Sequence, residues 1–162
     1  MRQPDKVQQM TTVAEIMDAD PVTISPDTDV QTVVETMKAN ELPGLPVVDA
    51  EGKCVGIVTE SDLIIADEEA DLHIPHYIQI MGGIVWLEPL RHFEEKFKKA
   101  LASDASQMMT SEDLTTVGPN STVAEAGKAI AEHGHNRLPV VDSEGRLVGV
   151  VTRVDVLGAL TA

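Results

Sequence analysis

Apolar and polar residues in the first third of the chain follow a pattern whose period changes in a regular order. An apolar stretch at 22–24, closed by Ser25-Pro26, predicts a short strand. The next apolar positions have the i, i+3, i+4, i+7 spacing of one helix face. They are Val30, Val33, Val34 and Met37. Thr28 and Gln31 have capping-box spacing ahead of this face, which favours an amphipathic helix with Thr28 as its cap.

Two β-branched runs follow the predicted helix. They occupy 46–48 and 55–58 and are joined by Asp49-Ala50-Glu51-Gly52. Asp can hydrogen-bond the backbone of such a turn and Gly can adopt positive φ there, so a β-hairpin is predicted. The second run leads into Thr59-Glu60-Ser61-Asp62 and then Leu63-Ile64-Ile65, which predicts a second helix. The predicted unit is β-α-β-β-α.

The same unit recurs later in the chain. LPVVDSEGRLVGVVTRVD, from Leu138 to Asp155, aligns with LPVVDAEGKCVGIVTESD, from Leu45 to Asp62, at an offset of 93 residues. The helix face of the second copy is formed by Val123, Ala126 and Ile130. The chain is therefore a duplication.

One copy alone has too little apolar surface to bury a core. We therefore expect an α+β, sandwich-like fold in which the two β-α-β-β-α copies pack about a pseudo-two-fold axis. The first copy, with the N-terminal segment, is assigned to residues 1–65 and the second to residues 104–162. Residues 66–103 form an insert between them.

Each copy ends in the pattern G-h-x-[ST]-x-x-D, where h is apolar: GIVTESD at 56–62 and GVVTRVD at 149–155. Two such units in tandem resemble a pair of CBS domains, the module named after cystathionine β-synthase. The resemblance implies a flat disc with two clefts between the copies, where many members bind AMP, ADP, ATP or S-adenosylmethionine. It also implies that Asp62 and Asp155 hold ribose hydroxyls. Thr59 and Thr152 would then reach the ribose or the phosphate.

Two interpretations of the Thr and Asp residues remain open. A carboxylate can accept both hydroxyls of a cis-diol, and free N–H groups at a helix N-terminus favour a phosphate. The alternative is structural, because T-x-x-D resembles a capping box in which Thr caps the helix and Asp interacts with its dipole. Duplication does not separate the two, since a structural cap would be duplicated as well.

The copies differ in charge around this pattern. Glu41 and Glu60 stand near the first pattern. The second is surrounded by His133, His135, Arg137 and Arg153. In a chain with a net charge of −15, a local basic cluster is where a phosphate would be tolerated. Arg137 and Arg153 are thus candidate phosphate ligands, for a ribose held by either copy, and a solvated helix end is the alternative.

The candidate ligand set has four further members. They are Thr23, Pro46, Ser61 and Pro139. The second copy has Val154 where the first has Ser61, so one polar contact is missing there. No cofactor is required in this interpretation, and the regulatory ligand is an adenine nucleotide with or without Mg²⁺.

The insert carries every aromatic residue of the chain, namely Tyr77, Trp86, Phe93 and Phe97. A helix is predicted from Glu88 or Pro89 to Ala102, with Phe93, Phe97 and Leu101 on one face. This face requires burial, either on the chain's own disc or across a homodimer. Trp86, Phe93 and Phe97 are the candidate interface residues.

Composition argues against several classes of partner and site. The net charge of −15 argues against nucleic acid and acidic membrane surfaces. No window reaches the roughly 18 apolar residues of a spanning helix, and no signal peptide is visible. The single Cys54 fits a reducing compartment, so a cytoplasmic protein is predicted. His73-x-x-His76 lacks further metal ligands, and Gly127-Lys128 lacks the remaining P-loop residues.

With no catalytic motif present, we predict a non-enzymatic sensor that binds an adenosine nucleotide and signals to a separate effector protein. S-adenosylmethionine and NADH are the alternative ligands. A structural or oligomerisation module without a nucleotide ligand is the alternative function.

Overall fold

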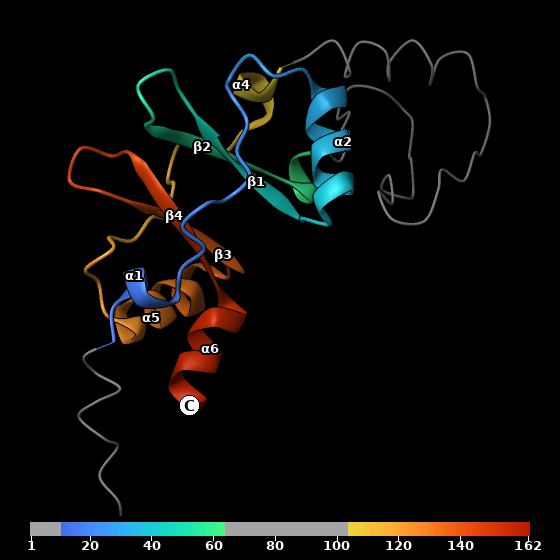
Figure 1. The fold of residues 1–162 in the computed structure, drawn as a ribbon. Helices are drawn as coiled ribbons and strands as arrows, with labels where there is room; N and C mark the ends of the chain where they lie inside the picture. The colour runs from blue at the N-terminus through green and yellow to red at the C-terminus, as the bar shows by residue number, and fades with distance from the viewer. Residues whose placement is uncertain (1–10, 64–103) are drawn as a thin grey trace, which may run out of the picture. The chain divides into compact units, whose positions relative to one another are not determined.

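The computed structural model describes residues 11–63 and 104–162, with only the backbone described at Ser61 and Leu63. The chain divides into two compact units (Figure 1). Of the described residues, unit 1 contains 11–22, 48–54 and 113–162, and unit 2 contains 23–47, 55–63 and 104–112. Each unit therefore combines the main part of one copy with a shorter piece of the other. The mixture of helices and small sheets confirms the predicted α+β class.

Unit 2 holds the main part of the first copy. Its elements are α2 (Val30–Asn40), β1 (Gly44–Val48), β2 (Cys54–Thr59), the 3-10 helix η1 (Glu60–Leu63) and α4 (Ala105–Met108). The predicted hairpin is confirmed as β1 and β2. The strand predicted at 22–24 is reduced to one parallel bridge, between Ile24 and Val47. The predicted helix face is buried at Val30, Val33 and Met37.

Unit 1 holds the main part of the second copy. Its elements are α1 (Val13–Ile16), α5 (Val123–His133), β3 (Arg137–Val141), β4 (Leu147–Thr152) and α6 (Arg153–Thr161). β3 and β4 are antiparallel, and Arg137 lies opposite Thr152 at the open end of the hairpin. The predicted face of α5 is buried at Val123, Ala126 and Ile130. The longest helices among the described residues, α2 and α5, have 11 residues each, against roughly 20 for a membrane span.

The N-terminus of α2 differs from the prediction. Asp29, not Thr28, is the N-cap, and its side chain accepts a hydrogen bond from the Thr32 N–H at 2.8 Å. This bond lowers the pKa of the Asp29 carboxyl. The Thr28 hydroxyl instead accepts a bond from the Ser25 N–H at 3.0 Å. The capping-box spacing was thus misleading by one residue, because Asp is a stronger N-cap than Thr.

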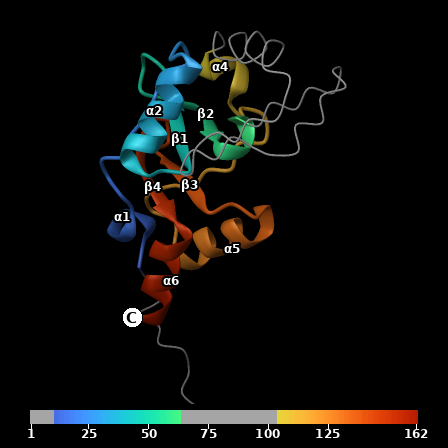
Figure 2. The same cartoon turned by 90° about the vertical axis from the view of Figure 1, so that its right-hand side faces the viewer.

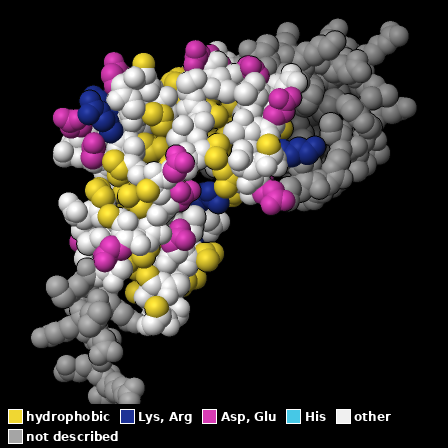
Figure 3. Space-filling view, in the orientation of Figure 1, with side chains coloured by type: hydrophobic (Ala, Val, Ile, Leu, Met, Phe, Trp, Pro, Cys, Tyr) yellow, Lys and Arg dark blue, Asp and Glu magenta, His cyan; other side chains and the backbone are white. Residues whose placement is uncertain are grey.

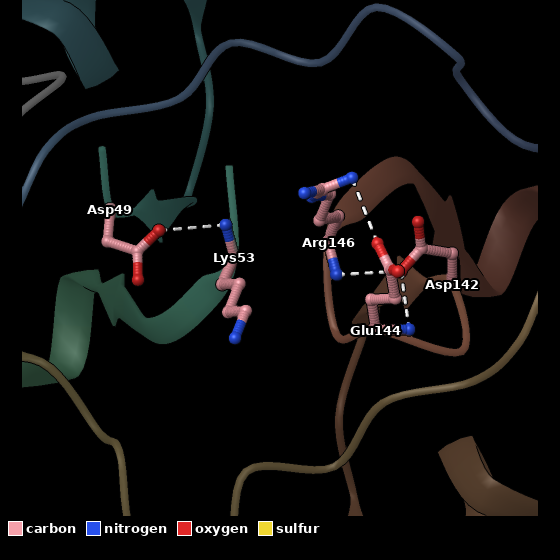
Figure 4. A network of polar contacts seen from close by, with 5 residues as sticks. All are labelled: Asp49, Lys53, Asp142, Glu144 and Arg146. Carbon is pink, nitrogen blue, oxygen red and sulfur yellow. Dashed lines mark hydrogen bonds and ion pairs between the residues drawn. The ribbon is translucent and has the colours of Figure 1, made fainter. Parts of the chain in front are cut away.

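The hairpin turns have the predicted chemistry (Figure 4). Oδ1 of Asp142 accepts bonds from the Glu144 and Arg146 N–H groups at 2.9 Å each. Oδ1 of Asp49 does the same for Glu51 and Lys53, at 3.0 and 2.9 Å. The glycines that close the turns have positive φ, 83° at Gly52 and 81° at Gly145. Asp and Gly are therefore both needed by the turn geometry.

The two turns also bond to each other within unit 1. The Cys54 N–H donates to the Gly145 carbonyl at 3.1 Å, and the Leu147 N–H donates to the Gly52 carbonyl at 3.0 Å. Lys53 and Arg146 form the corresponding antiparallel bridge.

The leading segment of each copy, residues 11–18 in the first and 104–110 in the second, packs on the other copy. In unit 1, α1 contacts β4 and α6 (Figures 1 and 2). Asp18 continues this contact as an antiparallel bridge to Val150, with both backbone bonds at 2.9 Å. The Val13 N–H donates to the Ser121 carbonyl at 2.8 Å. The second copy is therefore completed by the leading segment of the first.

Unit 2 shows the reciprocal arrangement. Thr110 forms an antiparallel bridge to Ile57, with backbone bonds of 2.9 and 3.1 Å. The Ala105 N–H donates to the Thr28 carbonyl at 2.8 Å, beside the start of α2. The duplication thus extends to an exchange of leading segments, which the sequence analysis did not predict.

Where each leading segment packs on the other copy, a methionine lies against a glycine. A Cβ added at Gly149 would lie 2.6 Å from Met17 Sδ and 2.7 Å from the Asp18 carbonyl oxygen. A Cβ added at Gly56 would lie 2.6 Å from Met109 Sδ, and its other near atoms also belong to the Met109 side chain. Only at Gly149 is backbone among these near atoms.

This difference predicts that Gly149→Ala and Gly56→Ala lower the free energy of unfolding by different amounts. We expect Gly149→Ala to lower the free energy of unfolding by about 1–3 kcal/mol, as overpacking does, because the Asp18 carbonyl is held in its bridge and cannot move away. Gly56→Ala should cost less, because the Met109 side chain is flexible. Met109→Ala should rescue Gly56→Ala, whereas Met17→Ala should not rescue Gly149→Ala. Urea denaturation of the four variants measures this, and equal rescue at both sites would contradict it.

The helix C-caps offer a second comparison between the copies. Glu41 ends α2 with φ 54°, whereas the equivalent residue after α5 is Gly134, with φ 67°. A residue with a Cβ is strained in this left-handed region. We expect Glu41→Gly to raise the free energy of unfolding by about 0.5–1 kcal/mol and Gly134→Glu to lower it similarly. Urea denaturation provides the test, and a stabilising Gly134→Glu would show that the argument is wrong.

Candidate functional site

The G-h-x-T-x-x-D pattern of the second copy forms the turn from β4 into α6. Thr152 is the N-cap of α6, and its hydroxyl accepts a bond from the Asp155 N–H at 3.2 Å. Oδ2 of Asp155 accepts bonds from the Thr152 N–H at 2.8 Å and the Thr152 hydroxyl at 2.7 Å. The structural interpretation of this pair as a capping box is therefore confirmed.

The first copy forms two of these three contacts at the turn from β2 into η1, without a bond from the Asp62 N–H to the Thr59 hydroxyl among the described residues. Oδ2 of Asp62 accepts bonds from the Thr59 N–H at 2.7 Å and the Thr59 hydroxyl at 3.1 Å. Asp62 and Asp155 are both half-buried. The two turns are thus alike in the bonds that the Asp carboxylate accepts from Thr.

These contacts use one oxygen of each carboxylate. Oδ1 of Asp62 and Oδ1 of Asp155 accept no hydrogen bond from the described atoms of residues 11–63 and 104–162, which do not include the Ser61 side chain. A carboxylate oxygen can accept about two bonds. Capping therefore leaves each Asp with acceptor capacity for a hydroxyl-bearing ligand, and the two interpretations of the pattern are compatible.

The predicted basic residues of the second copy lie at this turn. Arg137 is the cross-strand partner of Thr152. The Arg153 N–H donates to the Asn136 carbonyl at 2.9 Å, which fixes the backbone beside Arg137. In the described part of the chain no acidic side chain forms an ion pair with either arginine. Arg153 is exposed and Arg137 half-buried, so their charges are available to an anion.

His133 and His135 extend the basic cluster. Both are exposed, and their rings stack at a centroid distance of 6.1 Å with an interplanar angle of 12°. Asp and Glu side chains are spread over the face drawn in Figure 3, where Lys and Arg are fewer. The cluster is therefore a local exception on an acidic chain.

Gly44 is the feature that sequence reasoning missed. At the offset of 93 residues it stands where the second copy has Arg137. A Cβ at Gly44 would lie 3.0 Å from the Val58 carbonyl oxygen and 3.3 Å from Thr59 Cγ2. The first copy thus has a close backbone approach beside its Thr, where the second has a cation. A comparison of the copies at that offset would have revealed it.

The remaining candidates occupy other environments. Pro46 and Pro139 are buried, and their carbonyls accept bonds from the Ile24 and Val117 N–H groups at 3.1 Å each. Thr23 is exposed and directly precedes this contact. These residues stay predicted ligand contacts.

Several predictions fall outside the described residues. The side chain of Ser61 is one, and Trp86, Phe93 and Phe97 of the insert are the others. Within the described ranges no group of three or more His, Cys, Asp or Glu side chains is arranged to hold a metal ion.

Comparisons of both the sequence and the structure with known proteins find CBS domain proteins. The model of the CBS domain family matches residues 13–69 and 105–162. The uncharacterized protein MJ1426 of Methanocaldococcus jannaschii is 32% identical over 145 residues, which cover 86% of each chain. CBSX2 of Arabidopsis thaliana, whose crystal structure was solved in complex with AMP, has a TM-score of 0.68 at 25% identity. That match covers 93% of this chain and 96% of CBSX2.

An enzyme also appears among the relatives. Inosine-5'-monophosphate dehydrogenase of Aquifex aeolicus is 28% identical over 156 residues, but these cover only 26% of the enzyme. Its catalytic activity is therefore not transferred to this chain. The two matched segments, together with the fold, confirm the resemblance first drawn from GIVTESD and GVVTRVD. The chain belongs to the CBS domain family and carries two CBS domains in tandem.

Proposed function

We propose that this chain is a non-catalytic regulatory module that binds an adenosine nucleotide at its Thr-Asp turns. One observation carries the proposal: each turn has a half-buried carboxylate with one oxygen that accepts no bond from the part of the chain that the structure describes. The AMP complex of CBSX2 supports the choice of ligand class. Asp62 and Asp155 would accept ribose hydroxyls, and Thr59 and Thr152 would orient them.

The phosphate is assigned to the second copy. Arg137 and Arg153 flank Thr152 and lack acidic partners among the described residues, so an anion can neutralise them. Charge-assisted hydrogen bonds to phosphate are stronger than neutral ones. Mg²⁺ could accompany a polyphosphate ligand, and S-adenosylmethionine and NADH remain alternative ligands.

The output of the module is proposed to reach a separate effector protein in the cytoplasm. Ligand binding would act by favouring one conformation of the module over others. The second candidate function is structural, and the completed capping bonds favour it, because they show that Thr and Asp have a role without a ligand.

A titration with variants separates the two functions. AMP, ADP, ATP, NADH and S-adenosylmethionine are tested by thermal shift, because binding to the folded state stabilises it by about 2.7 kcal/mol at a hundredfold excess over Kd. Asp62→Ala and Asp155→Ala should each weaken nucleotide affinity at least tenfold, as expected for a charge-assisted bond of roughly 1.5–3 kcal/mol. Calorimetry of the purified variants measures this.

Asp142→Ala is the matched control. It removes two hydrogen bonds from an Asp carboxylate at the closed end of the hairpin, which five residues of strand place roughly 15 Å from Thr152. We expect it to reduce stability without changing nucleotide affinity. If no compound produces a shift at millimolar concentration, or if both Asp→Ala variants keep wild-type affinity, the structural function is correct.

The homodimer is a separate proposal, based on the aromatic residues of the insert. Trp86, Phe93 and Phe97 are proposed to form part of a two-fold interface. Phe97→Glu should shift the protein from dimer to monomer in sedimentation experiments at tens of micromolar, because a charge would be buried in an apolar contact. A monomeric wild-type protein, or a dimer that tolerates Phe97→Glu, would rule out this interface.

A further inference from the structure

The residues that follow Thr59 and Thr152 have equivalent backbone contacts but side chains of opposite charge. The Glu60 N–H donates to the Pro43 carbonyl at 3.0 Å, and the Arg153 N–H donates to the Asn136 carbonyl at 2.9 Å. Glu60 and Arg153 are equivalent at the offset of 93 residues, and both side chains are exposed. The fold therefore uses only the backbone at this position, and the charge is free to serve the ligand.

Neighbouring positions are also more positively charged in the second copy than in the first. Arg137 stands beside Thr152, whereas its equivalent beside Thr59 is Gly44. Glu41 adds a negative charge to the first copy, where the second has Gly134. Two charges oppose the trend. They are Lys38 in the last turn of α2, and Glu132, whose carboxylate lies 3.7 Å from Lys128.

We propose that Glu60 and Arg153 set the charge of the ligand that each copy accepts. The second copy, with Arg153, takes an adenosine compound with a 5′-phosphate. The first copy, with Glu60, takes an adenosine compound whose 5′-group is neutral or cationic. This inference rests on the proposed function, because it divides the adenosine ligands of the two turns by charge.

Coulomb's law gives the size of the expected effect. The attraction between two opposite unit charges about 7 Å apart in water is close to RT. It changes a dissociation constant by roughly a factor of three, before screening by salt. Reversal of one side-chain charge changes the product of charges by two units, and the phosphate of AMP carries between one and two negative charges. We therefore expect about a tenfold change in AMP affinity per reversal. Uncharged adenosine should be unaffected.

The experiment reads the ratio of the AMP and adenosine dissociation constants in each copy separately. Asp62→Ala leaves the turn of the second copy intact, and Asp155→Ala leaves that of the first. Calorimetry at low salt should show that AMP binds more tightly than adenosine to Asp62→Ala. The order should be reversed in Asp155→Ala. S-adenosylmethionine, which is cationic at its sulfonium, should follow adenosine.

Charge reversals then test the two residues directly. Arg153→Glu in the Asp62→Ala chain should lose the preference for AMP, and Glu60→Arg in the Asp155→Ala chain should gain one. Arg146→Glu is the matched control, because it makes the same charge change at the closed end of the hairpin, where Arg146 contacts Glu144 at 2.9 Å. It should leave both ratios unchanged. If an Asp→Ala background fails to fold, the same ratios are measured for the reversals in the otherwise wild-type chain.

The outcomes distinguish a failure of the proposed function from a failure of this inference alone. Absence of binding by every adenosine compound overturns the proposed function and this inference with it. Binding with the same AMP preference in both copies, or a ratio that does not respond to Arg153→Glu and Glu60→Arg, overturns the inference alone. A response that appears only for the ligand held by the other copy's Asp also overturns it.

Discussion

The exchange of leading segments is the constraint on which both units depend. Each hairpin has an outer strand whose backbone groups would otherwise be exposed, and an exposed edge is an unstable and aggregation-prone feature. Asp18 bonds to Val150 and Thr110 bonds to Ile57, so each edge is covered by a residue that belongs to the other copy. Neither copy can complete its unit from its own residues, which gives a physical reason for the duplication.

The exchange also affects how the binding of a ligand at one turn could be transmitted to the other copy. Val150 lies in β4, two residues before Thr152, and Ile57 lies in β2, two residues before Thr59. The covered strand and the turn are thus parts of the same short element. A ligand that shifts the turn acts on a strand whose other edge carries the leading segment of the opposite copy, so a response can pass between copies through backbone hydrogen bonds.

Much of the fold could be predicted from local signals. The hairpins followed from Asp and Gly in the turns, and the buried faces of α2 and α5 followed from their helical spacing. The exchange could not be predicted, because the spacing of Val13 and Met17 is the same whether their helix packs on its own copy or on the other. The N-cap of α2 was misplaced by one residue because the capping-box spacing of Thr28 and Gln31 was followed and not the stronger N-cap preference of Asp29.

The candidate site shows why sequence alone could not choose between a cap and a ligand contact. Thr and Asp at this spacing satisfy the helix terminus through Oδ2, and the same carboxylate still presents Oδ1. The backbone N–H groups of Glu60 and Arg153 make equivalent bonds, so the two turns are alike at this position, although the first leads into a 3-10 helix and the second into an α-helix. A difference in exposed charge between two structurally equivalent positions is therefore not explained by folding. The proposed function accounts for it through the charge of the ligand at each turn, since exposed charges contribute little to stability but act directly on a charged ligand.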